Sequence, residues 1–271
     1  MAKPRIITLL TDFGRSDSYV AQMKAVMLTV APDATLVDVT HDVPPGDVLA
    51  GAFALASALP HFPAGTVHCV VIDPTVGTDR RILAARYAGQ TVVAPDNGVI
   101  TLVDRVLPLE QIAAVRDRRY FRGPSVSATF HGRDIFAPVA AHLARGLVLD
   151  RLGPQPETVK FLEVPEPRVR ADGTMAGQVL YVDRFGNLIS NIPADSVAEA
   201  IGGGSDVGCG GRPVGPIRRA YADVERGEAL ALVNSMGLIE VAVNGGRAAD
   251  VLGAGVGTEV RVGAVGGGLS P

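Results

Sequence analysis

The segment VVIDPTVGTDRR (residues 70–81) joins a short apolar run to a Pro/Gly turn and then to charge. The β-branched run is typical of a buried strand, and Asp73 stands where that strand ends. Arg80 follows across the turn. In open α/β sheets ligands bind beyond the carboxyl ends of the strands, so this segment predicts an α/β fold with a polar site at the sheet edge.

The residues around this segment alternate between strand and helix patterns as far as residue 147. Val20, Met23, Met27 and Val30 have the spacing of one helical face, and Pro32 follows that helix. A second helix is expected from Asp47, a good N-cap residue, to the residue before Pro60. Strands are predicted at 5–13, 35–43, 66–73, 82–89 and 90–98, and helices within 18–32, 47–63 and 129–147. This order predicts a mainly parallel sheet flanked by helices.

The second half of the chain has a different pattern. We expect an N-terminal α/β domain over 1–163, a linker over 164–175 that is rich in Pro and charge, and a C-terminal all-β barrel or sandwich over 176–271. Strand patterns separated by turn residues recur without a long helix, in 177–192, 213–224, 228–245 and 258–263. The glycine-rich stretch 202–212 is expected to be a hairpin loop.

Composition excludes several classes of protein. The chain has 271 residues, 47% hydrophobic and 20% charged, with a net charge of −3 and no basic stripe of the kind that binds nucleic acid. No apolar run has the length of a signal peptide or a membrane span. The two cysteines, Cys69 and Cys209, lie in unlike contexts and are expected to be unpaired, one in a strand and one in a loop. These features predict a cytoplasmic protein that does not bind a membrane.

Acidic side chains follow three of the predicted strands. They are Asp12, Asp73 and Asp96, the last beside Asn97, and each is flanked by Gly or Pro. Three acidic residues at strand ends favour a shared ligand-binding crevice. Any one of them alone could instead be a turn residue or a helix N-cap. Asp12 suits a ribose diol, or it caps the helix that follows. Asn97 could also bind a ribose hydroxyl, or it is only a turn residue.

Arginine and histidine complete this set of candidates. Arg80 can pair bidentately with Asp73 and orient it, or form only a surface ion pair, and Arg81 is expected to face solvent. His131, between Phe130 and Gly132 ahead of a helix, is the histidine with the best position for function, whereas His68 lies in an apolar strand and is expected to be structural. No metal-binding, nucleotide-binding or nucleophile-elbow pattern is present.

The C-terminal half adds candidates in turns. Asp183 and Asn187 flank a Phe-Gly turn, and Ser235 precedes a Met-Gly turn. Asp183 suits an ammonium group, Asn187 a base edge and Ser235 a carboxylate. Each of these residues, taken alone, is equally well explained as an ordinary turn residue.

Taken together, these segments resemble the S-adenosyl-L-methionine (SAM) hydroxide adenosyltransferases, or SAM hydrolases, which are relatives of the fluorinating and chlorinating SAM enzymes. The resemblance extends over nearly the whole chain. The ordered set is specific, although no single motif is: LLTDFG, DVTHDVPPGDV, VIDPTVGTDRR, APDNG, TFHGRDIFAP, VDRFGNLISNI and NSMGLIEVAVN.

The resemblance implies a fold, an assembly and a site. It implies an α/β domain and a β-barrel domain, in a homotrimer that binds SAM between the N-terminal domain of one subunit and the C-terminal domain of its neighbour. It implies that Asp73, Arg80 and His131 form a water-activating triad, with SAM as substrate and no metal or other cofactor. The implied substrate contacts are Asp12 for ribose, Asp183, Phe185 and Asn187 for the amino group and adenine, Ser235 for the carboxylate, Tyr221 for adenine, and Asn97 and Asn244.

Several positions differ from the halogenating relatives. Those enzymes carry Tyr and Ser where this chain has Asp73 and Gly132, and they have an inserted loop near RYAGQ that is absent here. A carboxylate repels a halide, so the resemblance favours water as the nucleophile. Thr75 replaces a common Gly, and Met236 stands where halogenating relatives have an arginine for the methionine carboxylate. Hydrolysis of SAM to adenosine and L-methionine is the predicted function; a halogenase, a non-catalytic SAM or adenosine sensor and a metal-dependent phosphohydrolase are the alternatives.

Overall fold

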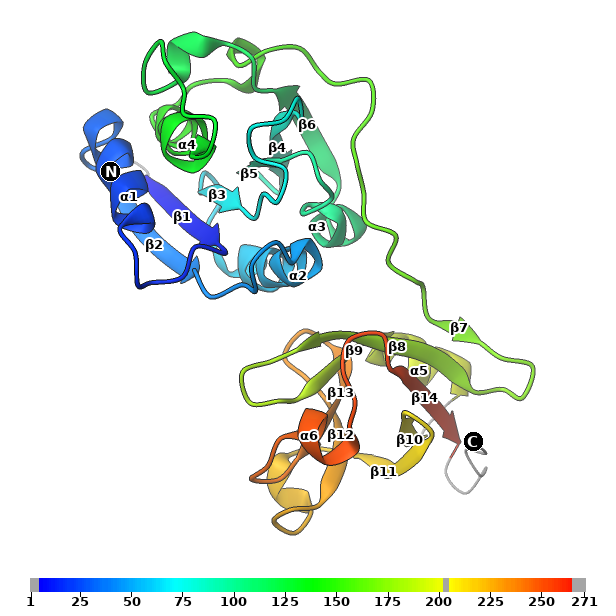
Figure 1. Ribbon diagram of the computed structural model, residues 1–271. Coiled ribbons are helices and arrows are strands. Elements are labelled where there is room, and N and C mark those ends of the chain that lie inside the picture. Colours follow the sequence, from blue (N-terminus) through cyan, green and yellow to red (C-terminus); the bar gives the residue numbers. More distant parts are fainter. Residues whose placement is uncertain (1–4, 202–204, 265–271) are drawn as a thin grey trace. The chain divides into compact units, whose positions relative to one another are not determined.

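The computed structural model describes residues 5–201 and 205–264. The chain forms two compact units, Met1–Leu162 and Glu163–Pro271 (Figure 1). No helix within the described ranges has the length and hydropathy that crossing a membrane requires.

The N-terminal unit is built on a six-stranded mixed sheet with the order β2-β1-β3-β5-β4-β6. Strands β2, β1, β3 and β5 are parallel, and β4 runs antiparallel to both β5 and β6. The mainly parallel sheet is therefore confirmed, with an antiparallel strand near one edge. The strands are β1 (Ile6–Thr11), β2 (Thr35–Thr40), β3 (Val67–Val71), β4 (Ile82–Tyr87), β5 (Gln90–Pro95) and β6 (Leu109–Ala114).

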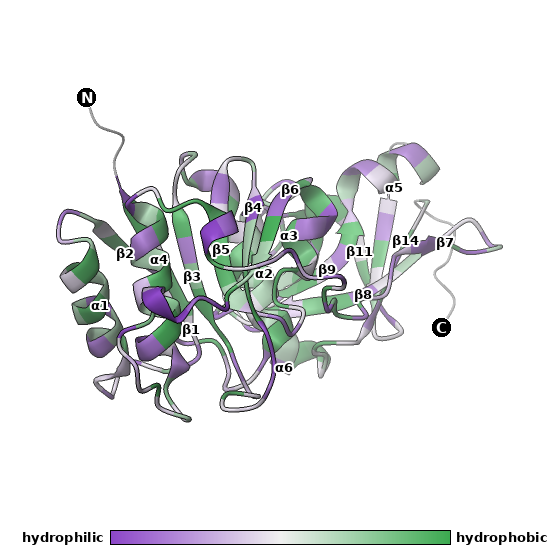
Figure 2. Cartoon of the chain, turned by 90° about the horizontal axis from the view of Figure 1, so that it is seen from above, coloured by the Kyte–Doolittle hydropathy of each residue, from purple (hydrophilic) through white to green (hydrophobic). Residues whose placement is uncertain are grey.

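Helices cover both faces of this sheet (Figure 1). On one face, Met23 and Met27 of α1 are fully buried. They belong to a core cluster that also contains residues of α4 and Ile7 and Leu9 of β1. On the opposite face α2 packs so closely that Gly51 lies against Ile72. Helix α1 carries both hydrophobic and hydrophilic residues, as Figure 2 shows, which fits a helix with one buried side. The helices are α1 (Tyr19–Val30), α2 (Val48–Ala58), α3 (Thr101–Val106) and α4 (Ala137–Ala144), with short turns η1 (Leu59–His61), η2 (Arg118–Tyr120), η3 (Gly132–Phe136) and η4 (Leu149–Arg151).

Local signals explain where two of these helices begin and end. Helix α1 stops at Val30, shortly before Pro32, as expected. The Asp47 carboxylate accepts a hydrogen bond from the Ala50 amide and caps α2. Strand β6 and helix α3 were not predicted, because each has only six residues and no clear hydrophobic period.

The C-terminal unit contains a closed seven-stranded barrel. The order is β14-β10-β11-β12-β13-β9-β8, and β14 pairs with β8 to close it. The expected barrel is therefore confirmed. Within the segment expected to be a linker, β7 adds to the outer side of β8. The strands are β7 (Arg168–Val169), β8 (Met175–Val182), β9 (Leu188–Pro193), β10 (Ser205–Cys209), β11 (Arg212–Arg218), β12 (Ala229–Val233), β13 (Leu238–Val243) and β14 (Glu259–Ala264).

Some expectations for this half were wrong. Residues 205–209 of the expected hairpin loop form β10, paired on both sides, and 202–204 lie outside the described residues. Cys209 is therefore buried in a strand, not in a loop; Cys69 is also buried, and both are unpaired as expected. The barrel also carries α5 (Ala194–Ile201), α6 (Ala248–Leu252) and the turn η5 (Tyr221–Asp223).

Candidate active site

Three acidic side chains follow strands that are neighbours in the N-terminal sheet. Asp12 comes directly after β1, Asp73 two residues after β3, and Asp96 directly after β5. Because β1, β3 and β5 are adjacent and parallel, their carboxyl ends meet at one edge. This is the position at which open α/β sheets bind ligands.

Asp12 is held by the turn before α2. Its Oδ2 accepts a hydrogen bond of 2.8 Å from the Gly46 amide. Helix α1 begins at Tyr19, so Asp12 does not cap it and that interpretation is wrong. Burial is the main cause that raises the pKa of Asp12, and the negative charge of Asp73 adds to it. The two carboxylates are therefore close enough to interact.

Asp73 and Arg80 form a buried ion pair. Arg80 Nε donates to both Asp73 oxygens at 2.9 and 2.8 Å, and Nη2 donates to Oδ2. Their side chains are only 4% and 5% exposed, so this is not a surface pair. Thr75 donates to Asp73 Oδ1 at 3.3 Å, so the residue that replaces a common glycine adds a contact to the carboxylate.

His131 extends this pair into a chain of three groups. Its Nδ1 lies 2.8 Å from Arg80 Nη2. A guanidinium has no acceptor, so Nδ1 must accept and the proton of the neutral imidazole must be on Nε2. Burial is the first cause that lowers the pKa of His131, and the charge of Arg80 is the second. The imidazole is therefore neutral near pH 7.

The segment that carries His131 is fixed by a second buried carboxylate. His131 precedes the π-helical turn η3, a distortion that is frequent at functional sites. Within η3, Asp134 accepts hydrogen bonds from Arg133, from Arg122 and from the Ser127 amide. The bond from Arg133 is the main cause that lowers the pKa of Asp134 to about 2. Sequence reasoning did not single out Asp134, although it lies in the same TFHGRD motif.

Aromatic rings connect the Asp12 and His131 segments. The rings of Phe13, Tyr19 and Phe130 are in mutual contact, with centroids 5.2–5.9 Å apart. A Cβ at Gly132 would lie 3.3 Å from Phe13 and Met23. The glycine at this position therefore lets η3 approach the aromatic cluster closely. No periodic pattern along the chain predicts these contacts, because the rings come from separate segments.

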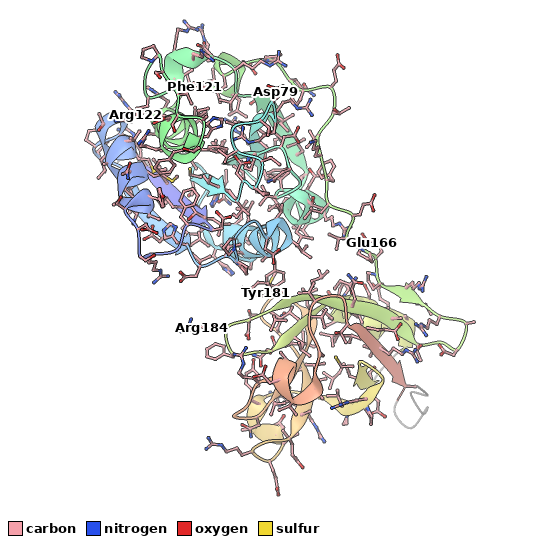
Figure 3. All side chains as sticks on the ribbon, viewed as in Figure 1. Asp79, Phe121, Arg122, Glu166, Tyr181 and Arg184 are labelled. Carbon is pink, nitrogen blue, oxygen red and sulfur yellow. The ribbon has the colours of Figure 1, made fainter. Side chains whose placement is uncertain are left out.

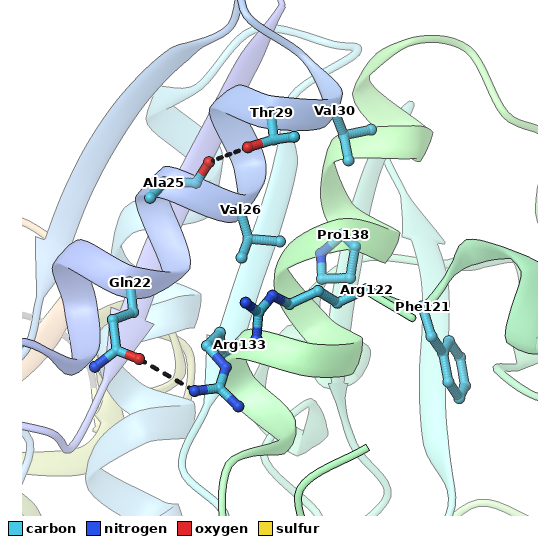
Figure 4. A pocket seen from close by; sticks show the side chains of 9 residues that line it. All are labelled: Gln22, Ala25, Val26, Thr29, Val30, Phe121, Arg122, Arg133 and Pro138. Atoms are coloured by element: carbon cyan, nitrogen blue, oxygen red, sulfur yellow. Dashed lines mark hydrogen bonds between the residues drawn. The ribbon is translucent and has the colours of Figure 1, made fainter. Parts of the chain in front are cut away.

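A cavity of about 320 Å³ borders the triad. Arg80 and His131 line it, together with Asp79 and Phe121, which are labelled in Figure 3. A second cavity of about 480 Å³ lies between α1 and the segment of Arg122 and Arg133 (Figure 4). Neither cavity is lined by a strand-end carboxylate, but of the two the first is lined by Arg80 and His131, so we assign the chemistry to the first.

Asp96 and Asn97 are tied into the structure. Asp96 is buried and accepts from Arg81 Nε and from the Lys160 amide. The expectation that Arg81 faces solvent was therefore wrong. Asn97 donates to the Ile72 carbonyl at 2.8 Å and accepts from the Val99 amide. Asn97 thus fastens its turn to the end of β3, which fits the turn interpretation.

The remaining histidines do not join the triad. His68 is buried between Thr8 Oγ1 and Gln90 Oε1, both at 2.8 Å, as expected for a structural residue. His41 is also buried, 2.9 Å from Thr11 Oγ1 and 3.0 Å from Asp38. Among the residues that the structure describes, no group of three His, Cys, Asp or Glu side chains could hold a metal ion.

In the C-terminal unit, Asp183 and Asn187 close the turn between β8 and β9. Asp183 accepts from the Asn187 amide at 2.9 Å and from its side chain at 3.1 Å. Asn187 is buried, whereas Phe185 at the tip of the turn is 73% exposed. Figure 3 labels Arg184 in this turn and Tyr181 on β8. An exposed aromatic ring beside a carboxylate is suited to an aromatic ligand with a positive charge.

The other predicted contacts of this unit lie in two turns. Tyr221, in η5, is 45% exposed, and its hydroxyl donates to Glu240 at 2.8 Å. Ser235 and Met236 are exposed in the turn between β12 and β13. Asn244 instead donates to the Val224 carbonyl, so its amide supports the backbone.

Comparisons with known proteins show which family this chain resembles. The model of the SAM hydroxide adenosyltransferase N-terminal domain matches residues 7–153, and that of the C-terminal domain matches residues 177–261. The (R)-S-adenosyl-L-methionine hydrolase of Salinispora tropica is 44% identical over 264 residues, which cover 97% of this chain and 99% of that protein.

A halogenating enzyme and a solved structure are also similar. The fluorinase of Nocardia brasiliensis is 31% identical over 95% of this chain and 97% of its own length. The crystal structure of an uncharacterized conserved protein from Thermotoga maritima has a TM-score of 0.88 and 38% identity, covering 95% of this chain and 99% of that one.

Proposed function

This chain belongs to the SAM hydroxide adenosyltransferase family, and from that premise we propose that it hydrolyses S-adenosyl-L-methionine to adenosine and L-methionine. The observation that carries the proposal is the chain of hydrogen bonds from Asp73 through Arg80 to His131, buried beside the acids of neighbouring strands. These groups can orient and polarise a water molecule that attacks the substrate directly.

The reaction is an in-line displacement at the ribose C5′. The oxygen of water forms a bond to C5′ while the C5′–S bond breaks, and its electron pair stays on the sulfur of methionine. A neutral thioether leaves without a proton, so no general acid is needed. The enzyme must hold the water in line and stabilise the charge that develops on its oxygen.

The hydrogen bonds divide these tasks among the triad. Arg80 supplies positive charge beside the developing hydroxide. His131 Nδ1 already accepts from Arg80, so the free Nε2 carries a proton and can only donate to the water. Asp73 is the member of the triad that can accept from water, at Oδ1, where the bond from Thr75 is long at 3.3 Å and can be replaced. We therefore assign the acceptance of the water proton to Asp73 and the orientation of the water to His131.

The substrate contacts in this proposal are those that the family resemblance implies. The Asp12 carboxylate receives the two ribose hydroxyls. In the C-terminal domain, Phe185 and Tyr221 pack on adenine, the Asp183–Asn187 turn binds the ammonium group and a base edge, and Ser235 binds the carboxylate. Asn97 and Asn244 act indirectly in this proposal, since their amides hold the backbone of the turns.

The proposal also covers the oligomeric state, the cofactor requirement and the cellular location. We propose a homotrimer in which the N-terminal domain of one subunit and the C-terminal domain of the next enclose SAM. We also propose that no metal or other cofactor takes part, so that activity survives a chelator. A cytoplasmic location is supported by the two unpaired, buried cysteines, which suit a reducing compartment.

Halogenation is the nearest alternative reaction. The fluorinase relative supports it, but Asp73 places a negative charge where a halide would have to bind, and such a pair of like charges is repulsive. We expect that added chloride or fluoride leaves adenosine as the product.

The decisive experiment separates the products by chromatography after incubation of the protein with SAM. We expect adenosine and methionine in equal amounts, and a large loss of activity for His131→Ala. The matched control is His61→Ala, which changes an exposed histidine at the end of η1 and should behave as the parent. Absence of adenosine from the parent, or equal rates for His131→Ala and the parent, would contradict the proposal.

A further inference from the structure

Glu240 is a buried acid that the proposed chemistry does not use. It lies on β13 among apolar neighbours and is only 4% exposed. Burial is the main cause that raises its pKa, and the nearby negative charge of Asp183 also raises it. A buried acid that faces another acid destabilises the fold unless it has strong partners. Its position therefore requires an explanation.

The partners of Glu240 are polar groups in two turns. The Tyr221 hydroxyl donates to its Oε1 at 2.8 Å. Asn234 is close enough to lower the pKa of Glu240, against the effect of burial. Asn234 Oδ1 already accepts from the Met236 and Leu238 amides at 2.9 and 3.1 Å. Glu240 therefore holds η5 through Tyr221 and lies beside Asn234, whose side chain closes the β12–β13 turn.

These are the turns that carry substrate contacts in the proposed function. Tyr221 is assigned to adenine, and Ser235 follows Asn234 in the turn assigned to the methionine carboxylate. Asp183, assigned to the ammonium group, is near enough for its charge to act on both Tyr221 and Glu240. One buried carboxylate thus connects the contacts for opposite ends of the substrate.

We propose that Glu240 is a positioning residue, which fixes the Tyr221 ring and the turn of Asn234 and Ser235 in the arrangement that receives SAM. The inference rests on the proposed function and adds a residue to the substrate-binding half of the site. Since Glu240 lies in the C-terminal unit and the triad in the N-terminal unit, its loss should weaken binding without slowing the chemical step.

The test compares Glu240→Gln, Tyr221→Phe and the double variant in steady-state kinetics with SAM. We expect Glu240→Gln to raise KM about tenfold with kcat within about twofold, because an interaction common to ground and transition states is lost. Tyr221→Phe should raise KM less. The double variant should be no worse than Glu240→Gln alone, because both changes break one network. Glu199→Gln, an exposed acid on α5, is the control and should match the parent.

Each outcome supports or overturns the inference. Unchanged KM in Glu240→Gln, or effects of the two single variants that multiply in the double variant, would overturn it. If Glu240→Gln does not fold, Tyr221→Phe decides, since it removes only the hydroxyl that donates to Glu240 and keeps the ring: unchanged KM overturns the inference and a raised KM supports it. If the parent binds SAM without hydrolysing it, the proposed reaction fails, and the same comparison is made with dissociation constants from calorimetry. If the parent does not bind SAM, both proposals fail.

Discussion

At the scale of single residues, the protonation states of the triad follow from its hydrogen bonds. Arg80 can only donate, so the two groups that it contacts must both accept. Both Asp73 oxygens therefore serve as acceptors, and His131 Nδ1 is unprotonated in the same structure. This arrangement makes the triad sensitive to any change that turns an acceptor into a donor.

Replacement of Asp73 by Asn tests this directly. The amide keeps the size of the side chain but removes the charge and turns an amino group toward Arg80. We expect kcat to fall by about 10² to 10⁴, the usual contribution of a positioned base, with KM within about threefold. The measurement is the initial rate of adenosine release. Asp150→Asn, which changes an exposed acid in η4 of the same unit, should retain the parent rate; a D73N rate equal to the control would contradict the assignment.

Protonation of His131 predicts the acidic limb of the pH–rate profile. A second ring proton on Nδ1 would face Arg80 Nη2 and break their bond, and the pKa of His131 is lowered in the folded protein. Activity should therefore be constant above the ordinary histidine pKa of about 6.5 and fall at lower pH. A midpoint above about 6.5 would contradict this account.

The same shift fixes the sign of the effect on stability. The unfolded chain takes up this proton at a higher pH than the folded chain does. The contribution of His131 to the free energy of unfolding is therefore complete above about pH 6.5 and is lost as the pH falls toward the lowered pKa. Burial also lowers the pKa of His68, so its contribution to stability changes in the same direction.

At the scale of elements, the turn from Asp73 to Arg80 brings the ion pair together. Gly77 in this turn has φ +83°, and a Cβ there would lie 2.5 Å from the Ala128 carbonyl oxygen. Ala128 belongs to the segment that leads to His131. The close approach at Gly77 therefore fixes the turn of Arg80 against the segment of its histidine partner.

Gly77→Ala should consequently reduce both stability and activity. Gly173→Ala is the matched control, since Gly173 has φ +80° with nothing within 4 Å of a Cβ. Both variants strain the backbone, but only Gly77→Ala also meets a carbonyl. We expect it to lower the free energy of unfolding by about 1–2 kcal/mol more than the control, and to reduce kcat. Equal urea midpoints and equal rates for the two variants would show that this contact is unimportant.

Local sequence patterns predicted the helices and strands that carry the site. The features that they did not predict depend on contacts between residues far apart in the chain. The spacing of Met23 and Met27 and the cap at Asp47 were sufficient for α1 and α2, because those signals lie within a few residues. Strand β10 follows three glycines and is stabilised by β11 and β14, so its pattern resembled a loop. Glu240 was missed because a single acid in an apolar strand looks like a solvent-facing residue until its partners are known.

At the scale of the whole molecule, the proposed triad belongs to one unit and most of the proposed substrate contacts belong to the other, and the sequences of the two units share no pattern. The ordered set of motifs predicted that both take part in one reaction. Spacing alone left every C-terminal candidate equally well explained as a turn residue. The pairing of β14 with β8 that closes the barrel joins strands about eighty residues apart, and no local pattern could reveal it.

The most direct measurement of the central claim is the fate of the oxygen of water. The protein is incubated with SAM in water enriched in ¹⁸O, and the products are analysed by mass spectrometry. Attack at C5′ predicts adenosine with one ¹⁸O at the 5′ oxygen and unlabelled methionine. Unlabelled adenosine, or label in methionine, would contradict a reaction in which Asp73, Arg80 and His131 deliver water to the ribose carbon.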